Sequence, residues 1–226
     1  MSYTPISESV ISAAKSSLGL QNLGDATIRE IKKIVDLIEA ESKIKFVRME
    51  MGIPGLPAAS LAIDSEIQAL RDGVAAIYPD IMGVKALKEE ISRFAKNFLN
   101  IDISSEGCVP TVGSIQGGYS SFMTFSRIHE NKDTVLFLDP GFPVHKQQIK
   151  VMGGKFEQFD VYNFRGEKLR EKLESVLSKG NIHSMLYSNP NNPTWICFTD
   201  TELKIIAELA AKYNVVVVED LAYIAM

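Results

Sequence analysis

The sequence predicts an α/β fold of three layers, in which helices cover both faces of a mostly parallel β-sheet. From residue 134 onward, short apolar runs alternate with amphipathic stretches, which is the order of strands and helices in such folds. The runs 134–138 (TVLFL) and 215–218 (VVVV) are almost wholly apolar, as strands are when both faces of a sheet are covered. Polar or turn-forming residues follow each run, as expected where a strand ends.

The first hundred residues predict helices joined by loops. Residues 26–40 (ATIREIKKIVDLIEA) repeat isoleucine at helical spacing with charges on the other side, and residues 84–99 show a similar apolar face. Between them we expect a loop at 49–57 (MEMGIPGLP), a helix at 65–76 and a turn at 78–83 (YPDIMG).

The second half predicts strands and helices in alternation. The expected strands are 134–138, 155–161, 182–187 and 215–218, and the expected helices are 147–152, 167–177 and 200–213. No internal repeat, low-complexity segment or composition shift interrupts this order.

Composition excludes several classes of protein. The net charge of −4 argues against non-specific binding of nucleic acid, which requires a basic surface. The sequence has no apolar run of about 18 residues and no N-terminal leader pattern, so we expect neither a membrane span nor secretion. Two cysteines without metal-like spacing favour a reducing compartment and predict no metal site. A cytoplasmic protein is the simplest interpretation.

Polar residues gather where the predicted strands end. Residues 139–142 (DPGF), 189–194 (NPNNPT) and 220–223 (DLAY) each follow a strand, and 112–118 (VGSIQGG) precedes a predicted helix. Ligands of open α/β sheets bind at the carboxyl ends of the strands, so we expect these four segments to share one crevice.

Segment 112–118 has the composition of an anion-binding loop. Gly113 permits close approach of the backbone, Ser114 can cap the following helix, and the first N–H groups of that helix favour a phosphate. A plain N-capped helix is the alternative. The glycine patterns of dinucleotide-binding and P-loop proteins are absent from the sequence, which disfavours a nucleotide-binding protein.

Four further residues have both a structural and a functional interpretation. Asp220 follows four valines, where a carboxylate either caps a helix, pairs with nearby backbone or holds a positive charge on a ligand. Tyr223 can face the same space. Asn192 either forms an ordinary Asn-Pro turn or presents an amide to a ligand, and Phe142 either belongs to the core or stacks on a cofactor.

Taken together and in this order, the segments MGIPGLP, YPDIMG, VGSIQGG, DPGFP, NPNNPT and EDLAY resemble the class I/II aminotransferases. These enzymes use pyridoxal phosphate (PLP) and have the aspartate aminotransferase fold, called fold type I. The resemblance runs from about residue 48 to the last residues. It implies a PLP-binding large domain that begins at residue 49, with residues 1–48 as a helical segment of the small domain.

The resemblance also implies roles for individual residues. Asn192 and Tyr223 would hydrogen-bond the phenolic oxygen of the cofactor, and Asp220 would pair with its protonated ring nitrogen. Phe142 would stack on the ring, and the backbone amides of Ser114 and Ile115 would bind the phosphate. The predicted catalytic residues are Asp220 and Tyr223.

Two further implications concern the substrate and a second subunit. Gly52 and Asn192 would lie near the substrate, which is an amino acid or a 2-oxo acid. Tyr78 would reach the phosphate of a partner subunit, which implies a homodimer with shared active sites.

The sequence departs from the family pattern in two places. The family's Schiff-base lysine follows the D-x-A-Y segment, whereas no lysine follows Tyr223 here, and Trp195 stands where the family usually has glycine. The resemblance therefore implies the N-terminal portion of an aminotransferase, with a large domain incomplete at its C-terminus and inactive by itself. A lyase or decarboxylase of the same fold, or a non-catalytic binder of a phosphate ligand, remains an alternative.

Overall fold

The computed structural model describes residues 5–52 and 55–224, and the chain divides into two compact units, Met1–Ile77 and Tyr78–Met226. The division falls after Ile77. The assignment of residues 1–48 and 49–226 to the small and large domains of a complete enzyme stays a prediction.

The first unit is helical. It contains α1 (Glu8–Ser17), α2 (Ile28–Ser42), α3 (Ser60–Arg71) and the 3₁₀ turns Leu23–Asp25 and Val74–Ala76. Helices α1 and α2 pack through Ala14, Ile34 and Ile38, all of which are buried. Helix α1 was not anticipated in the sequence. The helix predicted from residue 26 begins at Ile28, because Thr27 and Glu30 form a capping box ahead of it.

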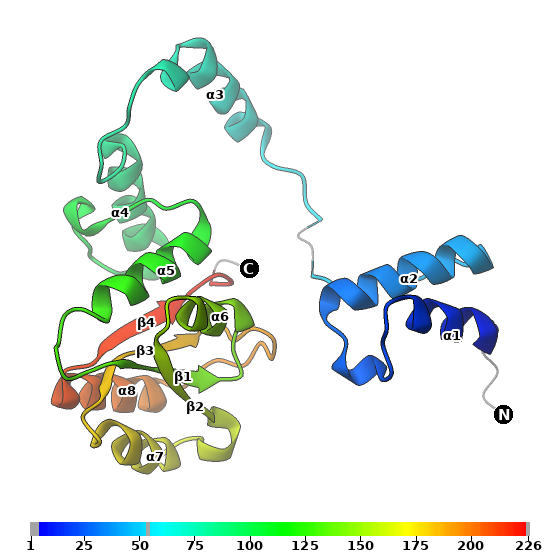
Figure 1. Ribbon diagram of the computed structural model, residues 1–226. Coiled ribbons are helices and arrows are strands. Elements are labelled where there is room, and N and C mark those ends of the chain that lie inside the picture. The colour runs from blue at the N-terminus through cyan, green and yellow to red at the C-terminus, as the bar shows by residue number, and fades with distance from the viewer. Residues whose placement is uncertain (1–4, 53–54, 225–226) are drawn as a thin grey trace. The chain divides into compact units, whose positions relative to one another are not determined.

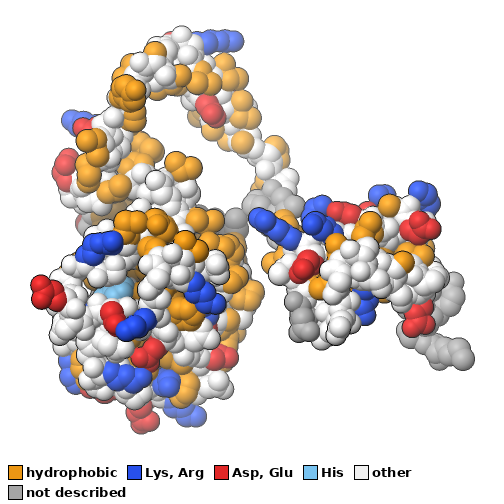
Figure 2. Space-filling model, in the orientation of Figure 1, with side chains coloured by type: hydrophobic (Ala, Val, Ile, Leu, Met, Phe, Trp, Pro, Cys, Tyr) orange, Lys and Arg blue, Asp and Glu red, His pale blue; other side chains and the backbone are white. Residues whose placement is uncertain are grey.

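Helix α3 differs from the prediction in its bounds and its environment. The sequence predicts a helix at 65–76, but the helix runs from Ser60 to Arg71 and ends there because Gly73 has φ +87°, which a right-handed helix cannot continue. None of its residues is buried, and its leucines and isoleucines form part of the hydrophobic surface in Figure 2.

The second unit contains the sheet. Its helices are α4 (Lys85–Leu99), α5 (Gly113–Phe125), α6 (Pro143–Val151), α7 (Lys168–Leu177) and α8 (Asp200–Tyr213). Its strands are β1 (Thr134–Asp139), β2 (Lys155–Asp160), β3 (Ile182–Ser188) and β4 (Val216–Asp220), and its 3₁₀ turns are Ser105–Gly107 and Val161–Phe164. The predicted helix 147–152 extends to Pro143, because proline suits the first position of a helix.

The four strands are parallel, in the order β2-β1-β3-β4. Helices α7 and α8 lie along one face of the sheet, and α5 and α6 lie along the other (Figure 1). Leu173 and Ile205 belong to the first core, and Phe122 and Ile149 to the second, each with 3% or less of its surface exposed. The predicted three-layer α/β/α fold is confirmed.

None of the described helices is both long and apolar enough to cross a bilayer. Within the same residues, no group of three or more His, Cys, Asp or Glu side chains is arranged to hold a metal ion.

Candidate functional site

The carboxyl ends of neighbouring strands lie level with one another. Asp139 at the end of β1 pairs with Asp160 of β2, and Ser188 at the end of β3 pairs with Asp220 of β4. The N–H of Asn189 donates to the carbonyl oxygen of Asp220 at 3.1 Å, which extends the pairing by one residue. The sheet therefore brings the segments after β3 and β4 to one edge.

Residues 189–195, here called the asparagine loop, are fixed by side-chain hydrogen bonds. The Nδ2 of Asn191 donates to the carbonyl oxygen of Pro140 at 2.7 Å, which ties this loop to the segment after β1. The N–H of Asn192 donates to the Oγ of Ser188 at 3.0 Å, and the Oγ1 of Thr194 donates to the Oδ1 of Asn191 at 2.7 Å. These bonds determine the position of Asn192.

Asn192 and Tyr223 are in direct contact. The Nδ2 of Asn192 donates to the phenolic oxygen of Tyr223 at 3.2 Å, and both side chains are half-buried. Because the tyrosine oxygen accepts this bond, its own hydrogen stays available, as does the second N–H of Asn192. The pair can therefore donate two hydrogen bonds to one oxygen of a ligand.

Asp220 lies on the same edge and is half-buried. Its Oδ1 accepts from the N–H of Ala222 at 3.2 Å, and its Oδ2 lies 3.5 Å from the Nε2 of His145. The imidazole of His145 lowers the pKa of the Asp220 carboxyl, an effect that partial burial opposes and the Ala222 N–H supports. Asp220 is thus held as a carboxylate.

His145 was missed in the sequence, although it is the main partner of Asp220. It is 3% exposed, and its Nδ1 lies 3.3 Å from the Oε1 of Gln148. The Nε2 of Gln148 donates to the carbonyl oxygen of Ile115 at 2.7 Å, which turns the Oε1 of Gln148 toward the imidazole. A chain of polar contacts thus runs from the amino end of α5 to Asp220.

The spacing of His145 and Gln148 is a signal in the sequence that could have identified this histidine. Helix α6 begins directly after Phe142. His145 and Gln148 lie three residues apart on this helix, so their side chains share one face of it. Gly118 on α5 leaves room for the imidazole, because a Cβ at that position would lie 2.9 Å from two atoms of the ring.

The amino end of α5 is open to an anion. Gly113, the first residue of this helix, has φ +73°, a conformation that favours glycine. Ser114 does not cap the helix as predicted, because the helix has already begun at Gly113 and the Oε1 of Gln116 accepts the N–H of Val112 instead, at 2.5 Å. The first N–H groups of a helix have no carbonyl partner within it, so those of Ser114 and Ile115 suit a phosphate.

The remaining predicted residues differ in their surroundings. Phe142 immediately precedes α6, is half-buried and lies edge-on to the His145 ring, with 6.0 Å between ring centroids. Tyr78 is 99% exposed. Gly52 belongs to the helical unit and not to the unit that holds the sheet. The structure thus assembles Asn192, Tyr223, Asp220 and Phe142 around one edge, whereas the roles of Gly52 and Tyr78 stay predictions.

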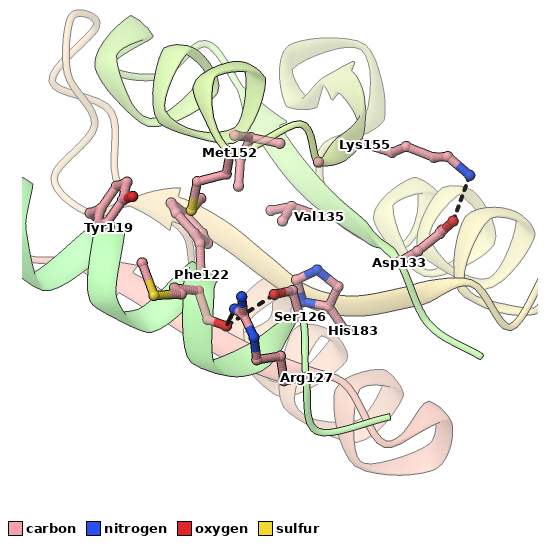
Figure 3. A pocket seen from close by; sticks show the side chains of 12 residues that line it. Tyr119, Phe122, Ser126, Arg127, Asp133, Val135, Met152, Lys155 and His183 are labelled. Atoms are coloured by element: carbon pink, nitrogen blue, oxygen red, sulfur yellow. Dashed lines mark hydrogen bonds and ion pairs between the residues drawn. The ribbon is translucent and has the colours of Figure 1, made fainter. Parts of the chain in front are cut away.

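A separate hollow of about 250 Å³ lies at the opposite ends of the strands (Figure 3). Asp133 precedes β1, Lys155 begins β2 and His183 is the second residue of β3, and Figure 3 shows all three near this hollow. The hollow therefore lies at the amino ends of the sheet, away from the predicted site residues.

Comparisons with known proteins agree with this architecture. The family model for aminotransferase class I and II matches residues 51–226. This chain belongs to that family. The aminotransferase chain is 29% identical over 195 residues to an aspartate aminotransferase of Pyrococcus horikoshii, an alignment that covers 84% of this chain and 48% of that protein.

Two other aminotransferases are similar to this chain over the same share of their length. A probable aspartate aminotransferase of Methanocaldococcus jannaschii is 26% identical over 203 residues, with coverage of 90% and 51%. The crystal structure of an aspartate aminotransferase from Thermotoga maritima superposes with a TM-score of 0.72 at 23% identity, covering 86% of this chain and 51% of that one. The chain thus has the aminotransferase fold and spans about half the length of the curated relatives it matches.

Proposed function

We propose that this chain forms the cofactor-binding part of a pyridoxal-phosphate-dependent aminotransferase, which transfers an amino group from an amino acid to a 2-oxo acid. The observation that carries the proposal is the arrangement at the carboxyl edge of the sheet. There, Asn192 and Tyr223 form a pair of hydrogen-bond donors, and Asp220, three residues before Tyr223, is an ionised carboxylate.

The residues present fit the cofactor chemically. Pyridoxal phosphate has a phenolic oxygen, a basic ring nitrogen and a phosphate. The donor pair of Asn192 and Tyr223 suits the phenolic oxygen, the carboxylate of Asp220 suits the protonated nitrogen, and the amino end of α5 suits the phosphate. Phe142, half-buried beside His145, would cover one face of the ring.

When bound, the cofactor would act as an electron sink that stabilises negative charge at the α-carbon of the substrate. The role of Asp220 is to keep a proton on the ring nitrogen, and a carboxylate can do so only while it is ionised. His145 supports this role by lowering the pKa of Asp220. Asn192 and Tyr223 would orient the other side of the ring through two hydrogen bonds to one oxygen.

The finer features of the proposal rest on the resemblance to the family. We assign the substrate side to Gly52 and Asn192, and we assign Tyr78 to the phosphate of a partner subunit in a homodimer. We place the enzyme in the cytoplasm. Because the chain spans about half the length of its relatives, we propose that it binds the cofactor but shows no transamination without the residues that the longer relatives contain.

The test measures cofactor binding directly. Pyridoxamine phosphate is used as the probe, because it has no aldehyde and cannot condense with surface lysines. Equilibrium dialysis should show one probe molecule bound per chain. Asp220→Asn should weaken binding at least tenfold, the equivalent of about 1.4 kcal/mol. The matched control, Asp200→Asn on the exposed start of α8, should bind as the unmodified chain does. Equal affinity of the Asp220→Asn and Asp200→Asn chains would contradict the proposal.

Transamination is assayed on the product expressed from the gene with its own start and stop codons. Incubation with an amino acid and a 2-oxo acid should yield the 2-oxo acid derived from the first and the amino acid derived from the second. Release of carbon dioxide with an amine would instead identify a decarboxylase, and release of ammonia with a 2-oxo acid in the absence of any added 2-oxo acid would identify a lyase.

A further inference from the structure

Trp195 has an unusual backbone conformation for a residue with a large side chain. Its φ is +64°, in the left-handed region that favours glycine. The other described residues with a side chain and a positive φ are Lys43, Asn100 and Asn214, and each of them directly follows a helix, where this conformation is common. Trp195 follows no helix and belongs to the asparagine loop.

The surrounding loop holds this conformation in place. The N–H of Trp195 donates to the carbonyl oxygen of Asn191 at 2.6 Å, and Asn191 is itself bonded to Pro140 and Thr194. A glycine would form the same turn without steric cost. The indole ring must therefore be explained by what it contacts rather than by what the turn requires.

The indole contacts Tyr223. The two ring centroids lie 5.6 Å apart with an angle of 64° between the ring planes, an edge-to-face arrangement that is favourable for aromatic pairs. Trp195 is 54% exposed, so this contact does not belong to a hydrophobic core. Tyr223 thus meets the asparagine loop at two points, with its ring against Trp195 and its hydroxyl against Asn192.

We infer that Trp195 is a positioning residue, whose indole fixes the ring of Tyr223 so that the tyrosine hydroxyl meets Asn192 and the ligand oxygen that they share. This inference rests on the proposed function, because it assigns that oxygen to the cofactor. Asn192 and Trp195 lie on one short loop, and the indole therefore sets the distance between the two donors.

The experiment compares Trp195→Gly, which removes the indole and suits the left-handed turn, with Trp195→Phe, which retains an aromatic ring. Binding of pyridoxamine phosphate is measured by equilibrium dialysis. We expect Trp195→Gly to bind about tenfold more weakly and Trp195→Phe to stay within about threefold of the unmodified chain. The urea midpoint of Trp195→Gly, followed by circular dichroism, should not fall, because glycine favours the turn. A purely structural role would lower the midpoint together with the affinity.

A double-variant cycle tests whether Trp195 acts through the hydroxyl of Tyr223. In a Tyr223→Phe background, Trp195→Gly should cause no further loss of affinity, since there is no hydroxyl left to position. An additive loss, or undiminished binding by Trp195→Gly alone, would overturn the inference.

A ligand-free measurement separates this inference from the proposed function. In chains with ¹³C-labelled tyrosine, the Tyr223 ring signal, assigned with Tyr223→Phe, should shift in Trp195→Gly and much less in Trp195→Phe. An unchanged signal in Trp195→Gly would overturn the contact itself. If the signal shifts but the unmodified chain binds no probe, the proposed function fails and the assignment of the shared oxygen fails with it, while the contact stands.

Discussion

Glu202, at the start of α8, is a buried carboxylate whose removal has a consequence that depends on pH. Its side chain is 1% exposed and accepts hydrogen bonds from the Nε of Arg165 at 2.6 Å and from the N–H groups of Gly166 and Thr199 at 2.8 Å each. Arg165 also donates to the carbonyl oxygen of Cys197 at 2.9 Å. Glu202 therefore anchors the segment that leaves the asparagine loop.

The magnitude follows from the pKa of Glu202. Burial raises this pKa, but the hydrogen bonds from Arg165, Thr199 and Gly166 outweigh burial and lower it from 4.5 to about 2. Because the folded pKa lies below the unfolded one, the stabilisation is complete above pH 4.5 and is lost as the pH falls through about 2. At about 1.4 kcal/mol for each pH unit, the difference corresponds to about 3 kcal/mol of unfolding free energy at pH 7.

The assay compares urea unfolding of Glu202→Gln and the unmodified chain. Trp195, the single tryptophan of the sequence, lies in the sheet-containing unit, so its fluorescence reports on the unit that holds Glu202. At pH 7 the variant should be about 3 kcal/mol less stable. Between pH 7 and pH 3 the difference should shrink by about 2 kcal/mol, because below pH 4.5 the unfolded chain binds a proton at Glu202 while the folded carboxylate stays ionised, and glutamine does not titrate.

Glu174→Gln serves as the control. Glu174 accepts from Lys212 and Tyr213, but its side chain is 38% exposed, so solvent screens the pair and its removal should change stability little. A stability difference for Glu202→Gln that stays the same from pH 7 to pH 3 would refute the reasoning.

Three further predictions concern the packing around the site. Gly118→Ala should displace His145 from Asp220, since the new methyl would lie 2.9 Å from the imidazole. The pKa of the Asp220 carboxyl, followed by ¹³C NMR titration, should therefore rise, and an unaltered titration would contradict the proposed packing. Phe122→Ala should lower the unfolding free energy, measured in urea, by about 3–5 kcal/mol, because the side chain is 0% exposed. A loss below about 1 kcal/mol would show that the surrounding core side chains close the cavity left by the ring. Asn191→Ala should lower the unfolding free energy by about 1–3 kcal/mol, because it leaves the carbonyl oxygen of Pro140 unpaired, and it should also weaken the binding of pyridoxamine phosphate. A loss of stability with unchanged affinity would show that Asn192 keeps its position without the side chain of Asn191.

The sequence alone determined the order of the elements and the edge of the sheet where the candidate site lies. Apolar runs identify β1 and β3 because both faces of the sheet are covered there, whereas the valines of the edge strand β4 are only partly covered, with Val217 37% exposed. Helix α8 has the predicted bounds because its capping box and its Asn214 cap are local signals. Asn192, Asp220 and Tyr223 could be selected because polar residues after buried strands in a parallel sheet share one edge.

Tertiary structure decided the partners of these residues. His145 reaches Asp220 from another element, Arg165 and Glu202 meet although they lie 37 residues apart, and the indole of Trp195 contacts Tyr223 rather than the core. It also left the apolar side chains of α3 exposed. Sequence periodicity reports which face of an element is apolar, whereas the neighbour of that face is fixed only when distant segments pack together.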